Sequence, residues 1–281
     1  MEEDRVKYSG FDTQNVIPKA VKNSERLSST ILTFYVATTF MYTIFTLSAP
    51  RFSETRSFIL NMDLPFDATE SPKYELVIIA QIIHLMLTGY AYGVFTALLL
   101  MLIIHTGCHV DVLCNIITDI ASFKDEEQFR FVTTRHQEII DFSEQIEKIF
   151  TYISFAQLLT NTAVSCCLGY ITVTSLHDEN ALPELFKAGF GYIAICIEIF
   201  TYCFAGEYLN NKNDMIVDAI YQMTWYNLQP STSRQVVLLL VRSQKGLRLT
   251  FGKFSTLSFE TFTWDLCSLQ ALTSHIMVLY L

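Results

Sequence analysis

The sequence lacks the short motifs that mark familiar enzyme sites. It has no Gly-x-Ser-x-Gly turn, no phosphate-binding Gly-x-x-x-x-Gly-Lys loop, no His-Glu-x-x-His helix and no Cys-x-x-Cys pair. Only His105 and His109 are spaced like a pair of metal ligands, and they stand where a long apolar stretch ends. A solvated helix end is the commoner reading of such a pair. We therefore predict that the chain is not an enzyme and holds neither a metal nor a cofactor.

Charged residues are also scarce. They make up 17% of the 281 residues, whereas 51% are hydrophobic and 14% are aromatic. The mean hydropathy of +0.32 favours surface hidden by lipid over a soluble core. The net charge of -9 comes with no basic stripe, so we predict no nucleic-acid partner.

A secretory signal and paired outer cysteines are missing as well. The first 25 residues alternate in charge and lack the apolar core of a signal peptide, which predicts a cytosolic N-terminus. The cysteines lie in apolar segments or in loops assigned below to the cytosol, so we expect no outer-loop disulfide. They are Cys108, Cys114, Cys166, Cys167, Cys196, Cys203 and Cys267.

Long apolar stretches are what the sequence has in abundance. A bilayer core about 30 Å thick requires about 20 apolar residues as helix. Five stretches approach or exceed this length, and finding five in one chain disfavours buried helices of a soluble protein. We predict an all-α, polytopic membrane helical bundle in a single domain, 1–281, with spans at about 27–47, 76–104, 149–173, 186–204 and 259–281.

Basic residues predict the orientation of these spans. Lys and Arg near span ends are retained in the cytoplasm. Segments 1–26, 105–148 and 206–258 hold fifteen of them, whereas segments 49–73 and 174–187 hold four. The N-terminus is therefore predicted inside and the C-terminus outside.

The two longest polar segments on the predicted inner side retain helical signals. Apolar residues recur at helical spacing between the acidic residues of 138–150, so we expect the spans to project below the membrane. In the connector 206–258, Pro230 with Ser231 suits a helix start and Gly246 a helix stop. This helix is apolar on more than one side, which predicts that it packs against another surface.

Three parts of the chain share their order and spacing with one family. The first is 136–142 with Ile146-Glu147, and the second is Leu64-Pro65-Phe66-Asp67 followed by 71–76. The third, in the connector, comprises Gly206-Glu207-Tyr208-Leu209, Ala219-Ile220-Tyr221, Trp225, Pro230, 236–241, 242–245, Phe254, Leu257-Ser258 and Thr261-Phe262.

Taken together, these stretches closely resemble insect odorant receptors, from about Ser28 to Phe262. Members of that family have seven spans with the N-terminus inside, so the resemblance implies that the first two are absent here. It also implies an odorant-tuning subunit of a ligand-gated, non-selective cation channel. Such a subunit would join an odorant co-receptor in a heterotetramer and bind small volatile molecules. Its expected place is the plasma membrane of the olfactory neuron dendrite.

The resemblance also implies site residues. A mostly apolar and aromatic ligand pocket is expected in the outer halves of the spans, which suits volatile molecules. Its candidates are Phe40, Tyr42, Phe45, Ile79, Ile83, His84, Tyr192, Ile193 and Cys196. The expected subunit anchor comprises Tyr221, Trp225, Leu238 and Leu239, and the expected pore or gate comprises Asp265, Ser268, Leu272 and His275.

Two acidic residues fall within predicted spans, where each is a functional candidate because burying its charge is costly. Glu198 is expected either to pair with a polar group on a neighbouring span or to face a wet cavity. Asp265 could contribute to an acidic ring that attracts cations. After Phe262, however, the sequence departs from the family pattern, which weakens the assignments of Asp265 and of the rest of the gate.

Three other membrane classes stay open. A gustatory receptor of the same superfamily is disfavoured because Ser268-Leu269 stands where Gln-Phe is usual. A G-protein-coupled receptor has the opposite orientation. A transporter would be expected to show internal repeats, and the sequence has none that we find.

Overall fold

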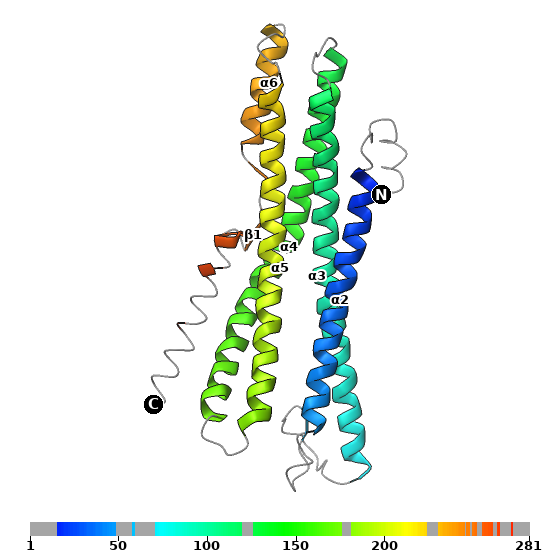
Figure 1. The fold of residues 1–281 in the computed structure, drawn as a ribbon, viewed down its shortest axis with the longest axis vertical. Coiled ribbons are helices and arrows are strands. Elements are labelled where there is room, and N and C mark those ends of the chain that lie inside the picture. The colour runs from blue at the N-terminus through cyan, green and yellow to red at the C-terminus, as the bar shows by residue number, and fades with distance from the viewer. Residues whose placement is uncertain are drawn as a thin grey trace. The chain divides into compact units, whose positions relative to one another are not determined.

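The computed structural model describes residues 16–48, 58–59, 71–119, 126–175, 181–223, 230–244, 246–247, 249–251, 255–260, 263–264 and 271. Five helices account for most of them, and Figure 1 shows their order along the chain. They are α2 (Val16–Ser48), α3 (Lys73–Asp119), α4 (Glu126–Ser175), α5 (Ala181–Gln222) and α6 (Pro230–Ser243). The predicted helical architecture is therefore confirmed.

Within the part of the chain that the structure describes, three helices are long and apolar enough to cross a membrane: Ile17–Leu47, Lys73–Thr118 and Ala188–Gln222. The predicted span 149–173 is helical and lies within α4, but α4 is not among these three. Nearly all of the predicted span 259–281 falls outside the described residues. The five spans and their orientation thus stay a prediction.

The helices run well beyond the predicted spans. Helix α3 continues past residue 104, α4 begins before residue 149, and α5 continues past residue 204. The first part of the expected connector is therefore the end of α5. Beyond it, α6 begins at Pro230 as predicted, and Gly246 follows it in a left-handed conformation (φ 75°), which glycine adopts without steric cost.

A small hairpin follows α6 and was not predicted. Strands β1 (Thr250–Phe251) and β2 (Ser255–Thr256) pair antiparallel, with Thr250 opposite Thr256. The amide of Leu257 donates a hydrogen bond of 2.9 Å to the carbonyl of Leu249, which extends the pairing by one step. Two-residue strands carry no periodic pattern, so the sequence offered no signal for them.

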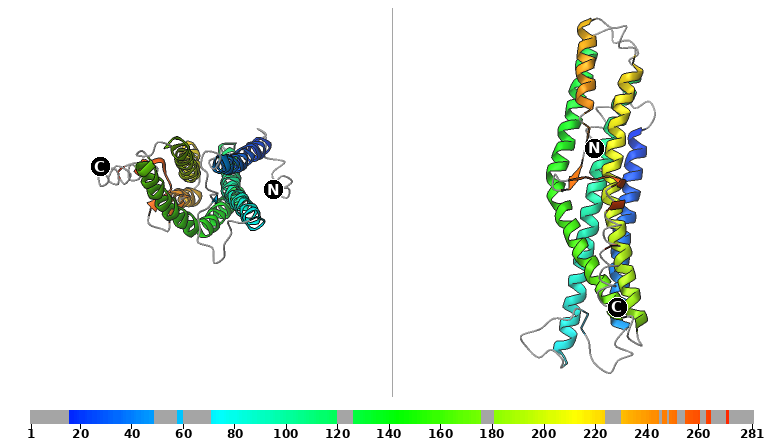
Figure 2. Two further views of the ribbon diagram at one scale, coloured as in Figure 1. Left: turned by 90° about the horizontal axis from the view of Figure 1, so that it is seen from below. Right: turned by 90° about the vertical axis from the view of Figure 1, so that its left-hand side faces the viewer.

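The chain divides into two compact units. Unit 1 comprises residues 1–27, 99–158 and 200–263, and unit 2 comprises 28–98, 159–199 and 264–281. In unit 1, α6 lies alongside α4 (Figure 2). The large apolar side chains that are fully buried all belong to this unit, among the described residues: Leu99, Leu100, Ile103, Val110, Leu113, Ile117, Val132, Leu209, Ile216 and Ile220.

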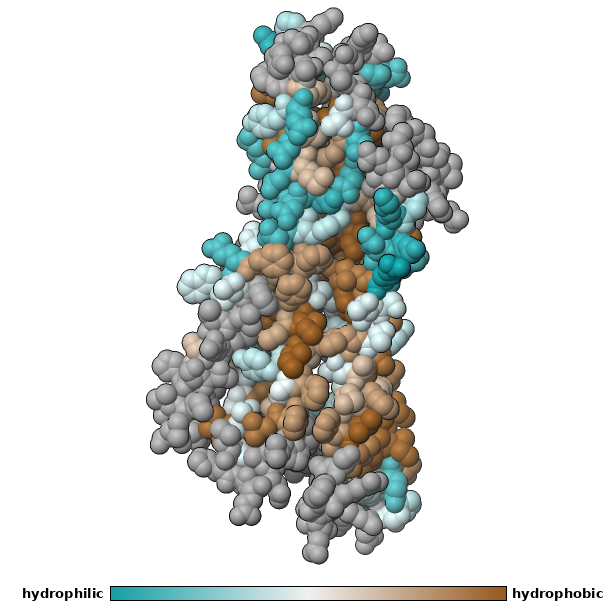
Figure 3. Space-filling view, viewed as in Figure 1, coloured by the Kyte–Doolittle hydropathy of each residue, from teal (hydrophilic) through white to brown (hydrophobic). Residues whose placement is uncertain are grey.

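Unit 2 shows the opposite distribution of apolar surface. Its helices expose many large apolar side chains, among them Phe40 at 55%, Leu76 at 64% and Leu87 at 64%. On the face drawn in Figure 3, hydrophobic residues gather over this unit, and hydrophilic residues gather over unit 1. Apolar surface on this scale is typical of helices surrounded by lipid.

Small residues let α2 and α3 approach closely within unit 2. Gly89 and Gly93 lie one helical turn apart on α3. A Cβ atom on Gly89 would lie 2.1 Å from Oγ1 of Thr39, and one on Gly93 would lie 3.0 Å from Cδ1 of Leu32. This is the small-residue spacing by which membrane helices bring their backbones together.

Candidate functional site

The nine predicted ligand residues all lie in unit 2, on α2, α3 and α5. Five of them are exposed, including Phe40, Ile79, Ile83 and Ile193 at 53% to 55%, and His84. Tyr42, Phe45, Tyr192 and Cys196 are half-buried. The half-buried residues are the better placed to line an enclosed pocket, and the exposed ones present their side chains outward.

Phe45 contacts two aromatic side chains of α5. Its ring stacks on Phe186 with centroids 6.4 Å apart, and it lies 5.9 Å from the ring of Phe190. Offset aromatic pairs at such distances stabilise helix contacts beyond the area they bury. Phe186 and Phe190 were not among the predicted ligand residues, although their spacing of one helical turn was a visible signal.

Glu198 pairs with a polar group on the neighbouring helix, which was one of its two predicted environments. Nδ2 of Asn161 on α4 donates a hydrogen bond of 3.3 Å to its carboxylate, and both residues are 7% exposed. Ser165, one turn beyond Asn161, is 1% exposed, and its hydroxyl has no partner among the described residues. The interior of unit 2 therefore holds a polar group between α4 and α5.

The predicted pore and gate residues, Asp265, Ser268, Leu272 and His275, lie outside the described residues, as does Trp225 of the predicted anchor. Of the other anchor residues, Tyr221 is 55% exposed and Leu238 is 69% exposed, so both are available to a partner. Leu239 differs from the expectation. Its side chain is only 6% exposed and packs within its own chain, because helical geometry turns it inward with Val236.

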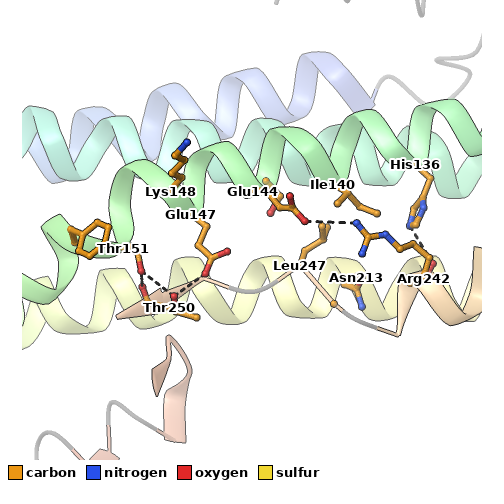
Figure 4. A pocket seen from close by; sticks show the side chains of 14 residues that line it. His136, Ile140, Glu144, Glu147, Lys148, Thr151, Asn213, Arg242, Leu247 and Thr250 are labelled. Carbon is orange, nitrogen blue, oxygen red and sulfur yellow. Dashed lines mark hydrogen bonds and ion pairs between the residues drawn. The ribbon is translucent and has the colours of Figure 1, made fainter. Parts of the chain in front are cut away.

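A polar cavity of about 590 Å³ lies in unit 1, and the sequence did not predict it. Figure 4 shows it between α4, α5 and the segment that joins α6 to the hairpin. The lining residues from α4 recur every three or four positions, which places them on one helix face. The full lining is His136, Ile140, Ser143, Glu144, Glu147, Lys148, Thr151, Tyr152, Asn213, Arg242, Ser243, Gly246, Leu247 and Thr250.

Two contacts hold the end of α6 against α4 at this cavity. The hydroxyl of Ser243 lies 3.2 Å from Nε2 of His136, and both residues are buried. The guanidinium of Arg242 lies 3.7 Å from the carboxylate of Glu144, a long and partly exposed ion pair. Such a pair stabilises the fold little, because solvent screens it.

A tighter network holds the hairpin. The hydroxyl of Thr151 donates a hydrogen bond of 2.7 Å to the carbonyl of Thr250, and the two hydroxyls lie 3.0 Å apart. The hydroxyl of Thr250 donates in turn to Oε1 of Glu147 at 2.8 Å. Three side chains thus fix β1 to α4, directly before the segment in which the gate is expected.

Burial and, to a smaller extent, the nearby charge of Arg242 together lower the pKa of His136 from 6.5 to about 4. The imidazole is therefore neutral at physiological pH. The hydroxyl of Ser243 donates its proton to the carbonyl of Leu239 at 2.9 Å, so the neutral ring donates from Nε2 to the oxygen of Ser243.

His105 and His109 meet edge to face on α3, with ring centroids 4.5 Å apart. They line a cavity of about 230 Å³ with Arg135, Glu138 and Phe142, among others. No group of three or more potential metal ligands is found among the described residues. The pair is thus packed between α3 and α4 rather than lying at a solvated end.

An ion pair joins α3 to α5 in unit 1. Nζ of Lys212 lies 2.5 Å from the carboxylate of Asp111, and it also lies 5.5 Å above the ring of Tyr208. Both charged side chains are largely buried, at 15% and 24% exposure. Sequence analysis missed this pair because its members are 101 positions apart and neither falls in a predicted span.

Known proteins provide three kinds of match. A model of the 7tm odorant receptor family matches residues 12–266. Odorant receptor 2a of Drosophila melanogaster is 26% identical over 121 residues, which is 42% of this chain and 30% of that protein. Odorant receptor 10 of Aedes albopictus is 22% identical over 224 residues, covering 76% and 58%. The chain therefore spans less than two thirds of the length of these relatives.

The fold also matches a solved structure. The insect olfactory receptor OR5 from Machilis hrabei superposes with a TM-score of 0.76, over 96% of this chain and 69% of that one, at 14% identity. The same receptor in complex with eugenol gives a TM-score of 0.74 over 97% of this chain. At this level of identity the likeness shows the fold.

Proposed function

The chain belongs to the insect 7tm odorant receptor family, and from this we propose that it is an odorant-tuning subunit of a ligand-gated, non-selective cation channel. The match over residues 12–266 carries the proposal, because it includes both units. We propose that the subunit works in a heterotetramer with an odorant co-receptor in the plasma membrane of an olfactory neuron dendrite.

The ligand we propose is a small, largely apolar volatile molecule bound in unit 2. Aromatic and aliphatic side chains with few polar groups suit such a ligand. The contact of Phe45 with Phe186 and Phe190 supports this location, since the three rings offer an aromatic surface where the pocket is expected. A related fold has been solved with eugenol, a molecule of this class.

We expect the channel to open because the ligand binds the open state more tightly than the closed state. A ligand shifts an equilibrium between closed and open states only if it binds one of them more tightly. Helices α3, α4 and α5 each contribute residues to both units, so a change at the ligand end of a helix can bias the end that holds the hairpin. The hairpin precedes the segment expected to form the gate.

Exposed apolar side chains support assembly with neighbouring subunits. Tyr221 at the end of α5 and Val237, Leu238 and Val241 on α6 are 46% to 69% exposed. Apolar surface of this kind on an otherwise polar unit is typical of protein interfaces.

Whole-cell recording tests the proposal. The chain is expressed with an odorant co-receptor and exposed to a panel of volatile molecules, with a full-length family member as the positive control. We expect a volatile-evoked cation current that is absent when the co-receptor is expressed alone. A silent chain beside a responding control, at equal surface expression, would contradict the proposal.

A further inference from the structure

The polar cavity of unit 1 contains hydrogen-bonding groups that no contact explains. Asn213 projects from α5 into this cavity (Figure 4), and it is only 5% exposed. Its side-chain amide has no hydrogen-bond partner among the described residues, and neither has the hydroxyl of Ser143, which is 3% exposed. Because these polar groups face the cavity without a partner in the described part of the chain, they are free to hydrogen-bond a polar occupant.

The charges around the cavity are mixed. Glu144 and Glu147 bring two carboxylates, and only one oxygen of Glu147 is used, by Thr250. Lys148 lies one helical turn from Glu144 but makes no ion pair among the described residues. Arg242 adds a guanidinium that pairs with Glu144, so two cationic and two acidic side chains line the cavity. They complement a molecule that carries both an anionic and a cationic group.

The cavity also lies at a change in the surface of α4. Up to Lys148, the exposed residues of the helix are polar, such as Asp141 and Gln145. From Ile149 onward they are largely apolar: Ile149 is 58% exposed and Tyr152 is 66% exposed. This is where the predicted span 149–173 begins. Lys and Tyr side chains are favoured at such a boundary, because each joins an apolar body to a polar tip.

We propose that this cavity binds the headgroup of a phospholipid whose phosphate is joined to a primary ammonium, of the phosphatidylethanolamine class. Lys148 at the boundary pairs with the phosphate, and the acyl chains lie along the exposed apolar face of α4. The ammonium reaches further in, donating hydrogen bonds to the carboxylates of Glu144 and Glu147 and to Oδ1 of Asn213.

The same chemistry discriminates among lipids. A trimethylated headgroup has no N–H to donate, so the second oxygen of Glu147 and Oδ1 of Asn213 would gain no donor. An anionic headgroup without an amine would offer no cationic donor to the carboxylates. The primary amine donates charge-assisted hydrogen bonds that the other two headgroups cannot, so the preference for it is expected to be about tenfold or more.

Native mass spectrometry of the full chain in detergent measures this preference. Phosphatidylethanolamine, phosphatidylcholine and phosphatidylglycerol with identical acyl chains are titrated separately. We expect about tenfold tighter binding of the first. Combining Glu144→Gln with Glu147→Gln should abolish the preference, and the second of these substitutions keeps an acceptor for the hydroxyl of Thr250. Asn213→Leu should weaken only the ethanolamine lipid.

Asp141→Asn is the matched control. It removes one carboxylate charge from an exposed site on the same helix that does not line the cavity, and it should change nothing. Equal binding of the three lipids, or equal losses in the control and the cavity variants, would overturn the proposal. Soluble glycerophosphoethanolamine serves as a competitor. If it displaces the lipid at an equal concentration, the cavity recognises the free headgroup, and the assignment to a membrane lipid is wrong. These readouts need no odorant, so they stand apart from the proposed channel function.

Discussion

The backbone of Gly206 on α5 lies directly against Leu257, the residue that follows the hairpin. A Cβ atom at position 206 would lie 2.3 Å from the carbonyl oxygen of Leu257 and 2.5 Å from its Cβ. Because the first of these atoms belongs to the backbone, a side-chain rotation cannot relieve the clash. The contact requires glycine and fixes where the chain leaves the hairpin.

We therefore expect Gly206→Ala to displace this segment and to destabilise the chain by about 1 to 3 kcal/mol, the usual cost of overpacking. The melting temperature in detergent measures the effect. Gly189→Ala is the control, because a Cβ atom there meets nothing within 4 Å. That variant should melt no lower than the parent, since alanine favours a helix over glycine. Equal melting temperatures for the two variants would contradict the expected clash at position 206.

The hydrogen bond between Asn161 and Glu198 leads to a second prediction. Asn161→Leu removes a donor from a buried carboxylate, whereas the double variant with Glu198→Leu replaces both partners by apolar groups. We expect the single variant to melt lower than the double variant, with a coupling of about 0.6 to 2 kcal/mol in a double-mutant cycle.

Ala163→Leu, an exposed change on the same helix, controls for the added bulk in that cycle. If both Asn161→Leu and the double variant melt like the parent, the pair contributes nothing to stability and the prediction is wrong.

Features set by residues close together in the sequence were predictable, whereas contacts between distant segments were not. Helix α6 was placed correctly because Pro230 and Gly246 act on their own backbone. The need of Glu198 for a polar partner also followed from the sequence, since a carboxylate within an apolar helix is costly. Its partner could not be named, because helix packing alone decides which residue of a neighbouring helix faces it.

The polar cavity shows the same limit more strongly. Thr151 and Thr250 are 99 positions apart, and His136 and Ser243 are 107 apart. Each is an ordinary residue in its own segment, and the pairs exist only because α6 and the hairpin fold back on α4. The inward turn of Leu239 likewise follows from that packing.

Acid should weaken this packing through His136. Its pKa is about 4 in the folded chain and about 6.5 when unfolded. Between these values the unfolded state binds more protons, so stability is full above pH 6.5, decreases as the pH falls toward 4, and changes little below that. The loss should be about 1 to 3 kcal/mol.

Melting temperatures between pH 7.5 and 4 follow this titration. His136→Gln is the comparison variant: its side chain cannot be protonated in this range, but its amide still offers a donor to the hydroxyl oxygen of Ser243. We expect its melting temperature to vary less between pH 6.5 and 4 than that of the parent. Identical pH profiles would show that other groups cause the acid sensitivity.

The contact of Phe45 with Phe186 and Phe190 provides the last prediction. If these three rings form part of the ligand pocket, Phe45→Ala should raise the half-maximal concentration of an activating volatile about tenfold, because losing the contacts of a half-buried ring costs about 1.4 kcal/mol of binding. Phe40→Ala, on the same helix and 55% exposed, should shift it little. Whole-cell dose–response curves measure both, and surface labelling separates a loss of ligand affinity from a loss of folded protein. A larger shift in Phe40→Ala than in Phe45→Ala would mean that the ligand lies against the exposed face of α2, and the proposed location of the pocket would be wrong.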